Sequence, residues 1–232
     1  MKLKTISTIL IMVIALAVIS CNANKYADIP KPAGNETSLN IANAGTDTLK
    51  FYVNGTLQNL NSYIYPGGAS GYITIPDSVQ SLNFKKAANK SNYNSNYLFS
   101  TPLRLNIPDS TSHTLFVAGE TTDKCFLVKD TTASASGGAL IRFVHASPNV
   151  PATDVSVGDS VSFKNRSFKS VSGYVPISAG TKKLVVKQAG SSTSLLNNIA
   201  ITVTPGYTYT LYLKGKVNGT GNSAIGFGLL AR

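Results

Sequence analysis

A duplication within the chain constrains its fold more than any other feature of the sequence. Residues 69–75 (ASGYITI) recur as residues 171–177 (VSGYVPI), an offset of 102 positions, and both copies hold the tripeptide Ser-Gly-Tyr. The same offset places residues 82–85 on residues 184–187. Repetition at the length of a whole domain predicts two copies of one module rather than a short solenoid repeat.

A third matched pair follows in the same order. Residues 114–119 (TLFVAG) match residues 210–215 (TLYLKG) at an offset of 96, and the six-residue difference fits an insertion at 89–96 in the first copy. Small residues fill positions 131–138, which indicates a linker. The predicted modules are residues 36–130 (module 1) and residues 139–232 (module 2).

The residue pattern inside each module is typical of short strands. Within residues 207–213, the side chains at 207, 209, 211 and 213 are Tyr or Leu and share one face, with Thr208 and Thr210 opposite. Within 183–187, Leu184 and Val186 point inward and both lysines outward. Asn-Gly at 54–55 and Gly-Asp at 158–159 separate such runs, as hairpin turns do. With six to eight strands expected in about 95 residues, the sequence predicts an all-β protein of two tandem immunoglobulin-like β-sandwich modules.

The first 20 residues have the features of an export signal. Lys2 and Lys4 make a basic start, and residues 9–19 form an unbroken apolar run of eleven. As a helix this run would rise about 16 Å, roughly half the ~30 Å hydrocarbon core of a membrane. It is therefore too short to span a bilayer and is predicted to be the apolar part of a cleaved signal peptide, residues 1–20.

The end of that signal resembles the bacterial lipobox. Residues 18–21 read Val-Ile-Ser-Cys, and the resemblance implies that Cys21 carries acyl chains, palmitate among them, which anchor the mature protein in a membrane. Asn22 stands where enteric lipoproteins retained in the inner membrane have Asp. We therefore expect an outer-membrane location, on the periplasmic face or the cell surface, with residues 21–35 as a flexible tether.

Module 2 resembles a known family. Residues 141–148 (IRFVHASP) and 150–157 (VPATDVSV) are similar to the opening of the domain of unknown function 4397 family, and Ser-Gly-Tyr at 172–174 and Ala-Gly-Thr at 179–181 match its later elements. Asn149 departs from the usual Asp. The resemblance implies β modules of the cell envelope, often in tandem on lipoproteins, and it supplies no catalytic residues.

The sequence contains few residues of the types that catalytic sites use. His145 as a general base, Asp154 as its orienting group and Ser147 as nucleophile would suit a hydrolase, but Pro148 and Pro151 favour a loop in which His145 bonds to the backbone. Two His, two Cys and ten acidic residues, without a phosphate-binding loop, predict no enzyme, metal or cofactor. With Cys21 acylated, Cys125 has no disulfide partner and is predicted to be a buried, inert thiol.

The two modules differ in charge. Module 1 has seven basic and seven acidic residues, whereas module 2 has ten basic and two acidic, a net of +8. Module 2 is thus a candidate for binding an anionic surface such as lipopolysaccharide phosphates, acidic polysaccharide or an acidic envelope protein. Export argues against nucleic acid, and a solvated lysine face is the alternative. The proposed contacts are Lys164, Arg166, Lys169, Lys183 and Lys187.

The insertion in module 1 suggests a second kind of surface. Tyr93 and Tyr97 lie among asparagines, with Tyr63 and Tyr65 upstream, and such rings can stack on sugars while amides bond to hydroxyls. A flexible polar loop is the alternative. Together these features favour a non-enzymatic, lipid-anchored envelope protein with a structural or interaction role. Glycan or polyanion binding is the second hypothesis and an envelope hydrolase the third.

Overall fold

The computed structural model describes residues 36–58, 63–76, 80–87, 97–107, 111–131 and 138–232. All of them belong to one compact unit, Gly34–Arg232. The predicted signal peptide, the tether with Cys21, and Tyr93 lie outside the described residues. In the part of the chain that is described, no helix has the length and apolar character needed to cross a membrane.

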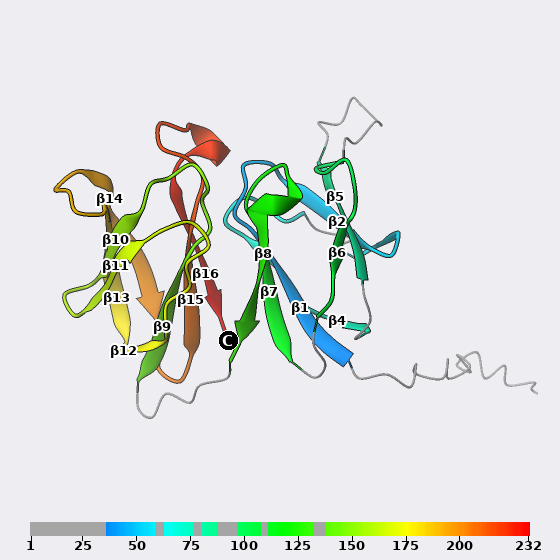
Figure 1. Ribbon diagram of the computed structural model, residues 1–232. Coiled ribbons are helices and arrows are strands. Elements are labelled where there is room, and N and C mark those ends of the chain that lie inside the picture. The colour runs from blue at the N-terminus through cyan, green and yellow to red at the C-terminus, as the bar shows by residue number, and fades with distance from the viewer. Residues whose placement is uncertain (1–35, 59–62, 77–79, 88–96, 108–110, 132–137) are drawn as a thin grey trace, which may run out of the picture. The chain divides into compact units, whose positions relative to one another are not determined.

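Module 1 is a sandwich of two four-stranded sheets, β4-β1-β7-β8 and β3-β2-β5-β6 (Figure 1). Its strands are β1 (Glu36–Asn43), β2 (Leu49–Val53), β3 (Thr56–Leu57), β4 (Ala69–Pro76), β5 (Gln80–Lys86), β6 (Leu103–Leu105), β7 (Ser112–Val117) and β8 (Cys125–Asp130). The β2–β3 turn is the predicted Asn-Gly pair. Asn54 and Gly55 have φ of 48° and 84°, the left-handed values that a two-residue hairpin turn requires.

Module 2 repeats this arrangement with sheets β12-β9-β15-β16 and β11-β10-β13-β14. Its strands are β9 (Ala139–His145), β10 (Thr153–Val157), β11 (Val161–Arg166), β12 (Val175–Ile177), β13 (Gly180–Gln188), β14 (Ser194–Val203), β15 (Thr208–Lys214) and β16 (Gly226–Ala231). The three matched sequence pairs fall on corresponding strands, β4 with β12, β5 with β13 and β7 with β15. Two tandem β-sandwiches are thus confirmed.

The strand order distinguishes these sandwiches from a constant-type immunoglobulin domain, although the two-sheet architecture is shared. In each module the first strand pairs in parallel with the seventh, β1 with β7 and β9 with β15. The constant immunoglobulin domain instead arranges its strands as ABED and CFG. The first strand therefore lies inside its sheet, between the fourth and seventh strands, and the chain entering each module is hydrogen-bonded on both sides.

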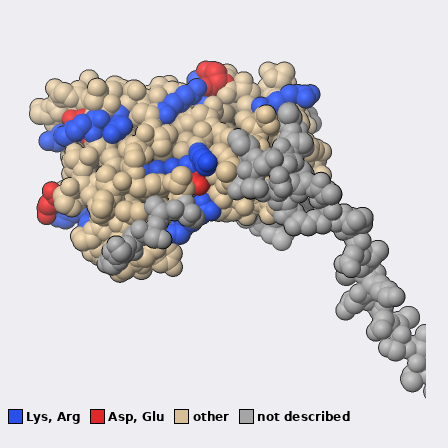
Figure 2. Space-filling model, turned by 60° about the horizontal axis from the view of Figure 1, so that its bottom comes forward, with Lys and Arg blue, Asp and Glu red and all other residues tan. Residues whose placement is uncertain are grey.

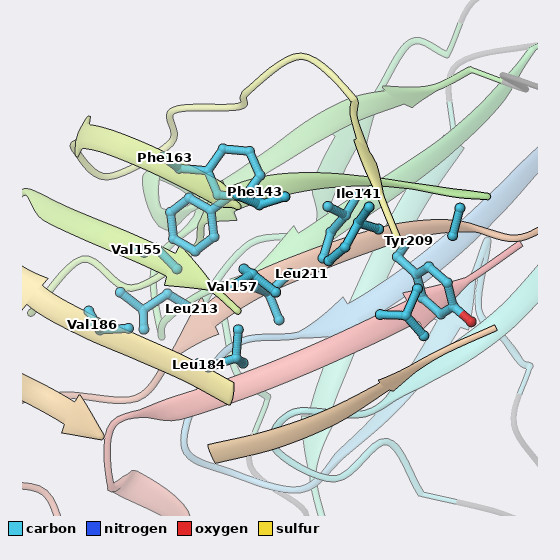
Figure 3. Close-up of a cluster of buried hydrophobic side chains, with 14 of the residues drawn as sticks. Ile141, Phe143, Val155, Val157, Phe163, Leu184, Val186, Tyr209, Leu211 and Leu213 are labelled. Atoms are coloured by element: carbon cyan, nitrogen blue, oxygen red, sulfur yellow. The ribbon is translucent and has the colours of Figure 1, made fainter. Parts of the chain in front are cut away.

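Each sandwich has its own apolar core. In module 2, Phe143 on β9 and Phe163 on β11 stack between the sheets at 5.8 Å between ring centroids (Figure 3). Leu184 and Val186 are fully buried whereas Lys183 and Lys187 are exposed, as their alternation predicts. Tyr207 is an exception. It precedes β15 and is 46% exposed, because the strand begins one residue later and the inward alternation starts at Tyr209.

A third apolar cluster joins the modules. Phe116 on β7 meets Tyr212 on β15 edge to face, with centroids 5.3 Å apart, and stacks on Phe126 at 5.2 Å. The remaining buried members are small or β-branched, which lets the two sheets approach closely: Ala42, Ala44, Ala118, Val128, Val144 and Ala146. Strands β7, β9 and β15 consequently bury both of their faces, which the strand pattern alone does not predict.

Candidate functional site

The Ser-Gly-Tyr repeat has a structural function in both modules. The hydroxyl oxygen of Ser70 accepts a hydrogen bond from the Ile41 amide at 2.9 Å, and that of Ser172 accepts one from the Phe143 amide at 2.8 Å. In module 1 the β1–β4 register shifts at this point. Each serine supplies an acceptor where strand pairing is interrupted, so the first strand keeps its backbone hydrogen bonds satisfied.

The tyrosine of each repeat lies against an arginine. The Arg232 guanidinium is 4.9 Å from the Tyr72 ring centre, and the Arg142 guanidinium is 4.9 Å from that of Tyr174. Such cation–π contacts contribute about 0.5–2 kcal/mol, depending on their exposure. Both pairs adjoin a polar network between the modules.

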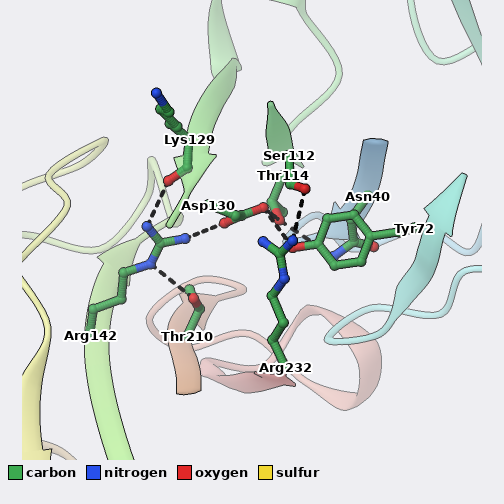
Figure 4. A network of polar contacts seen from close by, with 9 residues as sticks. All are labelled: Asn40, Tyr72, Ser112, Thr114, Lys129, Asp130, Arg142, Thr210 and Arg232. Atoms are coloured by element: carbon green, nitrogen blue, oxygen red, sulfur yellow. Dashed lines mark hydrogen bonds and ion pairs between the residues drawn. The ribbon is translucent and has the colours of Figure 1, made fainter. Parts of the chain in front are cut away.

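A buried ion pair between Arg142 of module 2 and Asp130 of module 1 forms the centre of that network (Figure 4). Arg142 is 4% exposed and Asp130 is 8% exposed. The arginine also donates to the Thr210 hydroxyl and to the Lys129 carbonyl, both at 2.9 Å. One guanidinium thereby holds three acceptors, two of them on β8, and links the modules through charge-assisted hydrogen bonds.

The Asp130 carboxylate is satisfied from module 1 as well. It accepts hydrogen bonds from the Thr114 hydroxyl at 2.7 Å and from the Tyr72 hydroxyl at 2.8 Å. Burial, and then the hydrogen bond to the carboxylate, raise the pKa of Tyr72 to about 12, so this phenol remains a proton donor. Because every polar group here has a partner, the network is equipped to fasten the modules together rather than to react.

Sequence reasoning missed this network, although Arg142 lies within the motif that resembles the family. The pattern of the sequence places Arg142 on a strand whose outward face would ordinarily be solvated. The one available signal is Thr114 and Thr210, which occupy matching positions of the repeat and bond to Asp130 and Arg142 respectively. Only the packing of the two sheets shows that these polar side chains face each other.

Two cavities adjoin the module junction. The smaller, of about 220 Å³, lies beside the network and is lined in part by Tyr72, Asp130, Tyr174 and Arg232. The larger, of about 300 Å³, is lined by backbone and by side chains of both signs, among them Asp47, Glu120, Lys124 and Lys216. Lys86 already pairs with Asp47 and Glu120, at 3.2 and 2.8 Å. Across the described residues, no group of three or more His, Cys, Asp or Glu is placed to hold a metal ion.

His145 is fully buried and bonds to the backbone, as the structural interpretation of its loop expects. Its Nε2 lies 3.2 Å from the Pro151 carbonyl oxygen, and its Nδ1 lies 3.5 Å from the Ser147 amide nitrogen. Since a carbonyl only accepts, Nε2 carries the proton and Nδ1 is the acceptor. Burial lowers the pKa of His145, which keeps the ring neutral.

The other two residues of the hydrolase hypothesis bond elsewhere. The Ser147 hydroxyl donates to the Gly215 carbonyl and is fully buried. The Asp154 carboxylate accepts from the Asn165 amide at 2.8 Å and from Lys164 at 3.4 Å. A relay in which Asp154 orients His145 toward the Ser147 hydroxyl is therefore not assembled in this structure.

Cys125 is the first residue of β8, which is the last strand of module 1, as predicted. Its side chain is half-buried rather than fully buried. The first residue of an outer strand has fewer neighbours than a central one. Burial nevertheless raises the pKa of the thiol to about 12, so the thiolate is scarce at neutral pH.

A family model now matches both modules. It is described as Domain of unknown function (DUF4397), and it matches residues 37–156 and again residues 139–229. The chain belongs to this family. The first match begins at residue 37, spans the rest of module 1 and continues to residue 156, within β10 of module 2. In module 1 sequence reasoning recognised only the Ser-Gly-Tyr element, because Asn43 stands there where the DUF4397 motif of module 2 has His145.

Other comparisons add little about DUF4397 function. No curated protein matches this chain in sequence. Among solved structures, a candidate cell adhesion protein from Bacteroides eggerthii DSM 20697 is similar, at 12% identity, over 85% of this chain and 96% of that chain, with a TM-score of 0.22. A likeness this weak carries no argument about what the present chain does.

The basic residues singled out in the second DUF4397 module do not form one cluster. Lys164, Lys183 and Lys187 lie on the outer face of sheet β11-β10-β13-β14, where Lys187 is the cross-strand partner of Asp154. Arg166 is half-buried, and Lys169 lies in the following loop, 5.6 Å from the Phe168 ring centre. On the face shown in Figure 2, basic side chains occur in separate groups with few acidic ones between them.

Tyr97 is 56% exposed on the first DUF4397 module, as a sugar-stacking residue would need to be. It pairs with Lys85 through an isolated backbone bridge, next to the outer face of sheet β3-β2-β5-β6. Tyr63 and Tyr65 are also exposed, at 44% and 60%, and their ring centroids are 6.4 Å apart. The structure therefore presents several tyrosines to solvent on this module.

Proposed function

We propose that this chain is a lipid-anchored, non-enzymatic protein of the cell envelope, whose two DUF4397 modules act together as one structural or interaction unit at the outer membrane. The buried Arg142–Asp130 pair carries this proposal. It fastens the β4-β1-β7-β8 sheet of module 1 to the β12-β9-β15-β16 sheet of module 2. Among the described residues, the β3-β2-β5-β6 and β11-β10-β13-β14 sheets have outer faces that are not packed against the other module.

The side chains best suited to catalysis are already hydrogen-bonded within the protein, which supports a non-enzymatic role. His145 and Ser147 bond to backbone groups of their own module, and Asp154 bonds to β11 residues. An enzyme needs such groups to be free to meet a substrate. Labelling with a serine-hydrolase activity probe tests this point. Labelling that is lost in a Ser147→Ala variant would revive the hydrolase hypothesis, whereas unlabelled protein supports a binding or structural role.

Membrane anchoring is proposed through Cys21, on the lipobox-like residues 18–21. Growth with an alkyne analogue of palmitate, followed by fluorophore coupling and membrane fractionation, tests it. Label on the wild-type chain in the outer-membrane fraction, and its loss in Cys21→Ser, support the proposal. An unmodified sulfur at position 21, found by mass spectrometry, contradicts it. Protease treatment of intact cells then assigns the leaflet.

Polyanion binding by module 2 is a second candidate. Lys183 and Lys187 are exposed on one sheet face, and neither forms an ion pair in the described part of the chain, whereas Lys164 pairs with Asp154. We expect binding to immobilised lipopolysaccharide that weakens steeply with salt and drops in Lys183→Gln/Lys187→Gln. Binding that ignores salt or this double variant would exclude the lysine face.

A further inference from the structure

The outer face of the β3-β2-β5-β6 sheet carries a row of lysines and tyrosines. On β2, Leu49, Phe51 and Val53 point into the core, which leaves Lys50 and Tyr52 on the outer face. On β5 the same alternation leaves Lys85 on the outer face. This sheet face thus brings together side chains from separate parts of module 1.

Lys50 and Lys85 are direct cross-strand partners in the β2–β5 register. Like charges directly opposite one another destabilise a sheet. Neither lysine forms an ion pair within the described residues, although their neighbour Lys86 is paired with both Asp47 and Glu120. Two uncompensated ammonium groups side by side form a site that an anion would stabilise.

Exposed rings stand on both sides of this lysine pair. The Lys50 ammonium is 4.9 Å from the Tyr63 ring centre, and the Lys85 ammonium is 4.6 Å from that of Tyr97 and 5.1 Å from that of Tyr52. Ile64, next to Tyr63, bridges to Leu49 on β2, and Tyr97 bridges to Lys85 on β5. The order across the sheet is therefore Tyr63, Lys50, Lys85 and Tyr97, three strand spacings or about 14 Å.

We propose that this row is a binding site for an acidic polysaccharide of the uronic-acid type. A sugar carboxylate would sit between the Lys50 and Lys85 ammonium groups, and the apolar faces of neighbouring sugar rings would stack on Tyr63 and Tyr97. The cation–π contacts hold the lysine heads beside the rings, which lowers the entropy lost on binding. The inference rests on the proposed non-enzymatic interaction role and is independent of lipid anchoring.

Three polymers separate the contributions of charge and ring. Polygalacturonate offers both carboxylates and sugar faces, its fully methyl-esterified form keeps the rings without charge, and poly-L-glutamate keeps the charge without rings. The purified full chain, in detergent, is tested against each polymer immobilised on a sensor over a range of salt concentrations. We expect clear binding to polygalacturonate, at least tenfold weaker binding to the ester, and at least tenfold weaker binding to poly-L-glutamate.

Variants then locate the site. Lys50→Gln/Lys85→Gln should weaken polygalacturonate binding at least tenfold and flatten its salt dependence. Tyr63→Ala/Tyr97→Ala should weaken it about fivefold with the salt dependence unchanged. Lys129→Gln/Lys216→Gln removes two exposed lysines outside both proposed faces and is the matched control, which should stay within twofold of the wild type. Lys183→Gln/Lys187→Gln tests the candidate face of module 2 instead. Lys50 and Lys85 are partly exposed and the other varied residues are exposed. An unchanged melting temperature verifies folding of each variant.

Other outcomes overturn the proposal. Absence of polygalacturonate binding, or binding lost only in Lys183→Gln/Lys187→Gln, excludes this face as the site. Equal binding of poly-L-glutamate that ignores the tyrosine variant shows a general anion surface instead. These results leave the palmitate-labelling and activity-probe experiments unaffected, so a failure here is distinguishable from a failure of the proposed envelope role.

Discussion

Asn43 of module 1 and His145 of module 2 occupy the same place in their modules, at the end of the first strand, and each side chain makes the same two kinds of bond. Asn43 Oδ1 accepts from the Gly45 amide at 3.0 Å, while its Nδ2 donates to the Asp47 carbonyl at 2.7 Å and to the Ile64 carbonyl at 2.8 Å. His145 Nδ1 accepts from the Ser147 amide and Nε2 donates to the Pro151 carbonyl. Both side chains hold the loop that follows the strand.

This equivalence predicts the effect of substituting His145. His145→Ala would leave the Pro151 carbonyl and Ser147 amide without partners and open a cavity, and we expect a loss of about 2–4 kcal/mol in the free energy of unfolding. His145→Asn restores the side chain used in module 1 and should lose about half as much. Chemical denaturation measures both. A cost below about 0.5 kcal/mol for His145→Ala would contradict the loop-holding role.

The buried histidines predict a pH dependence of stability. Burial lowers the pKa of His145 and His113 below the ordinary value of 6.5, so the unfolded chain binds more protons than the folded one as the pH falls through 6.5. Stability should therefore be constant between about pH 7.5 and pH 8 and decline as the pH is lowered from 6.5 toward the folded-state pKa values. Melting temperatures measured from pH 8 to pH 5 test this.

His145→Asn is the matched control for that decline. It removes one of the two titrating rings, so the fall in stability between pH 6.5 and pH 5 should be shallower than in the wild type, with His113 responsible for the remainder. A carboxylate such as Asp154, whose pKa is lowered by its bond from the Asn165 amide, contributes only at lower pH. An identical slope in the wild type and His145→Asn would refute the assignment.

The ion pair between the modules predicts a strong asymmetry between single and double substitutions. Arg142→Met leaves the Asp130 carboxylate buried without its cation, and we expect a loss of about 3–5 kcal/mol. Arg142→Met with Asp130→Leu removes both charges and should cost less than the single change. Denaturation of all four species of the double-mutant cycle gives the coupling energy directly.

Lys86→Met offers a comparison for the junction experiment. Lys86 pairs with Asp47 and Glu120 at a partly exposed position, where such pairs contribute about 0–1 kcal/mol. If Arg142→Met costs no more than Lys86→Met, the Arg142–Asp130 contact does not fasten the modules.

The Cys125 thiol should react slowly. Burial raises its pKa from 9.0 to about 12, so the thiolate fraction near pH 7.5 is about a thousandfold lower than for an unperturbed thiol. In a Cys21→Ser variant Cys125 is the sole cysteine, and mass spectrometry after iodoacetamide treatment follows its alkylation. The same variant in urea should react at the rate of a free thiol. Rapid modification of the folded form would contradict an inert Cys125.

Features that depend on residues close together in the sequence could be predicted from it, whereas features that depend on contacts between distant residues could not. Strand alternation, as in Lys183 to Lys187, and turn residues such as Asn54 and Gly55 act over a few positions, so the all-β class could be predicted from local pattern. The duplication revealed two modules because equivalent strands face equivalent environments. The loop-holding role of His145 followed from the neighbouring prolines.

What the local pattern could not provide was which strand faces meet. A side chain on the outer face of a strand obeys the same alternation whether water or a second sheet covers it, so Arg142, Phe116 and Tyr212 carry no mark of burial. The lysines of module 2, close in sequence, are divided between a sheet face and a loop for the same reason. Sequence alone determined the modules and their strands, and only tertiary packing decided that Arg142 and Asp130, separated by the linker, would share one buried site.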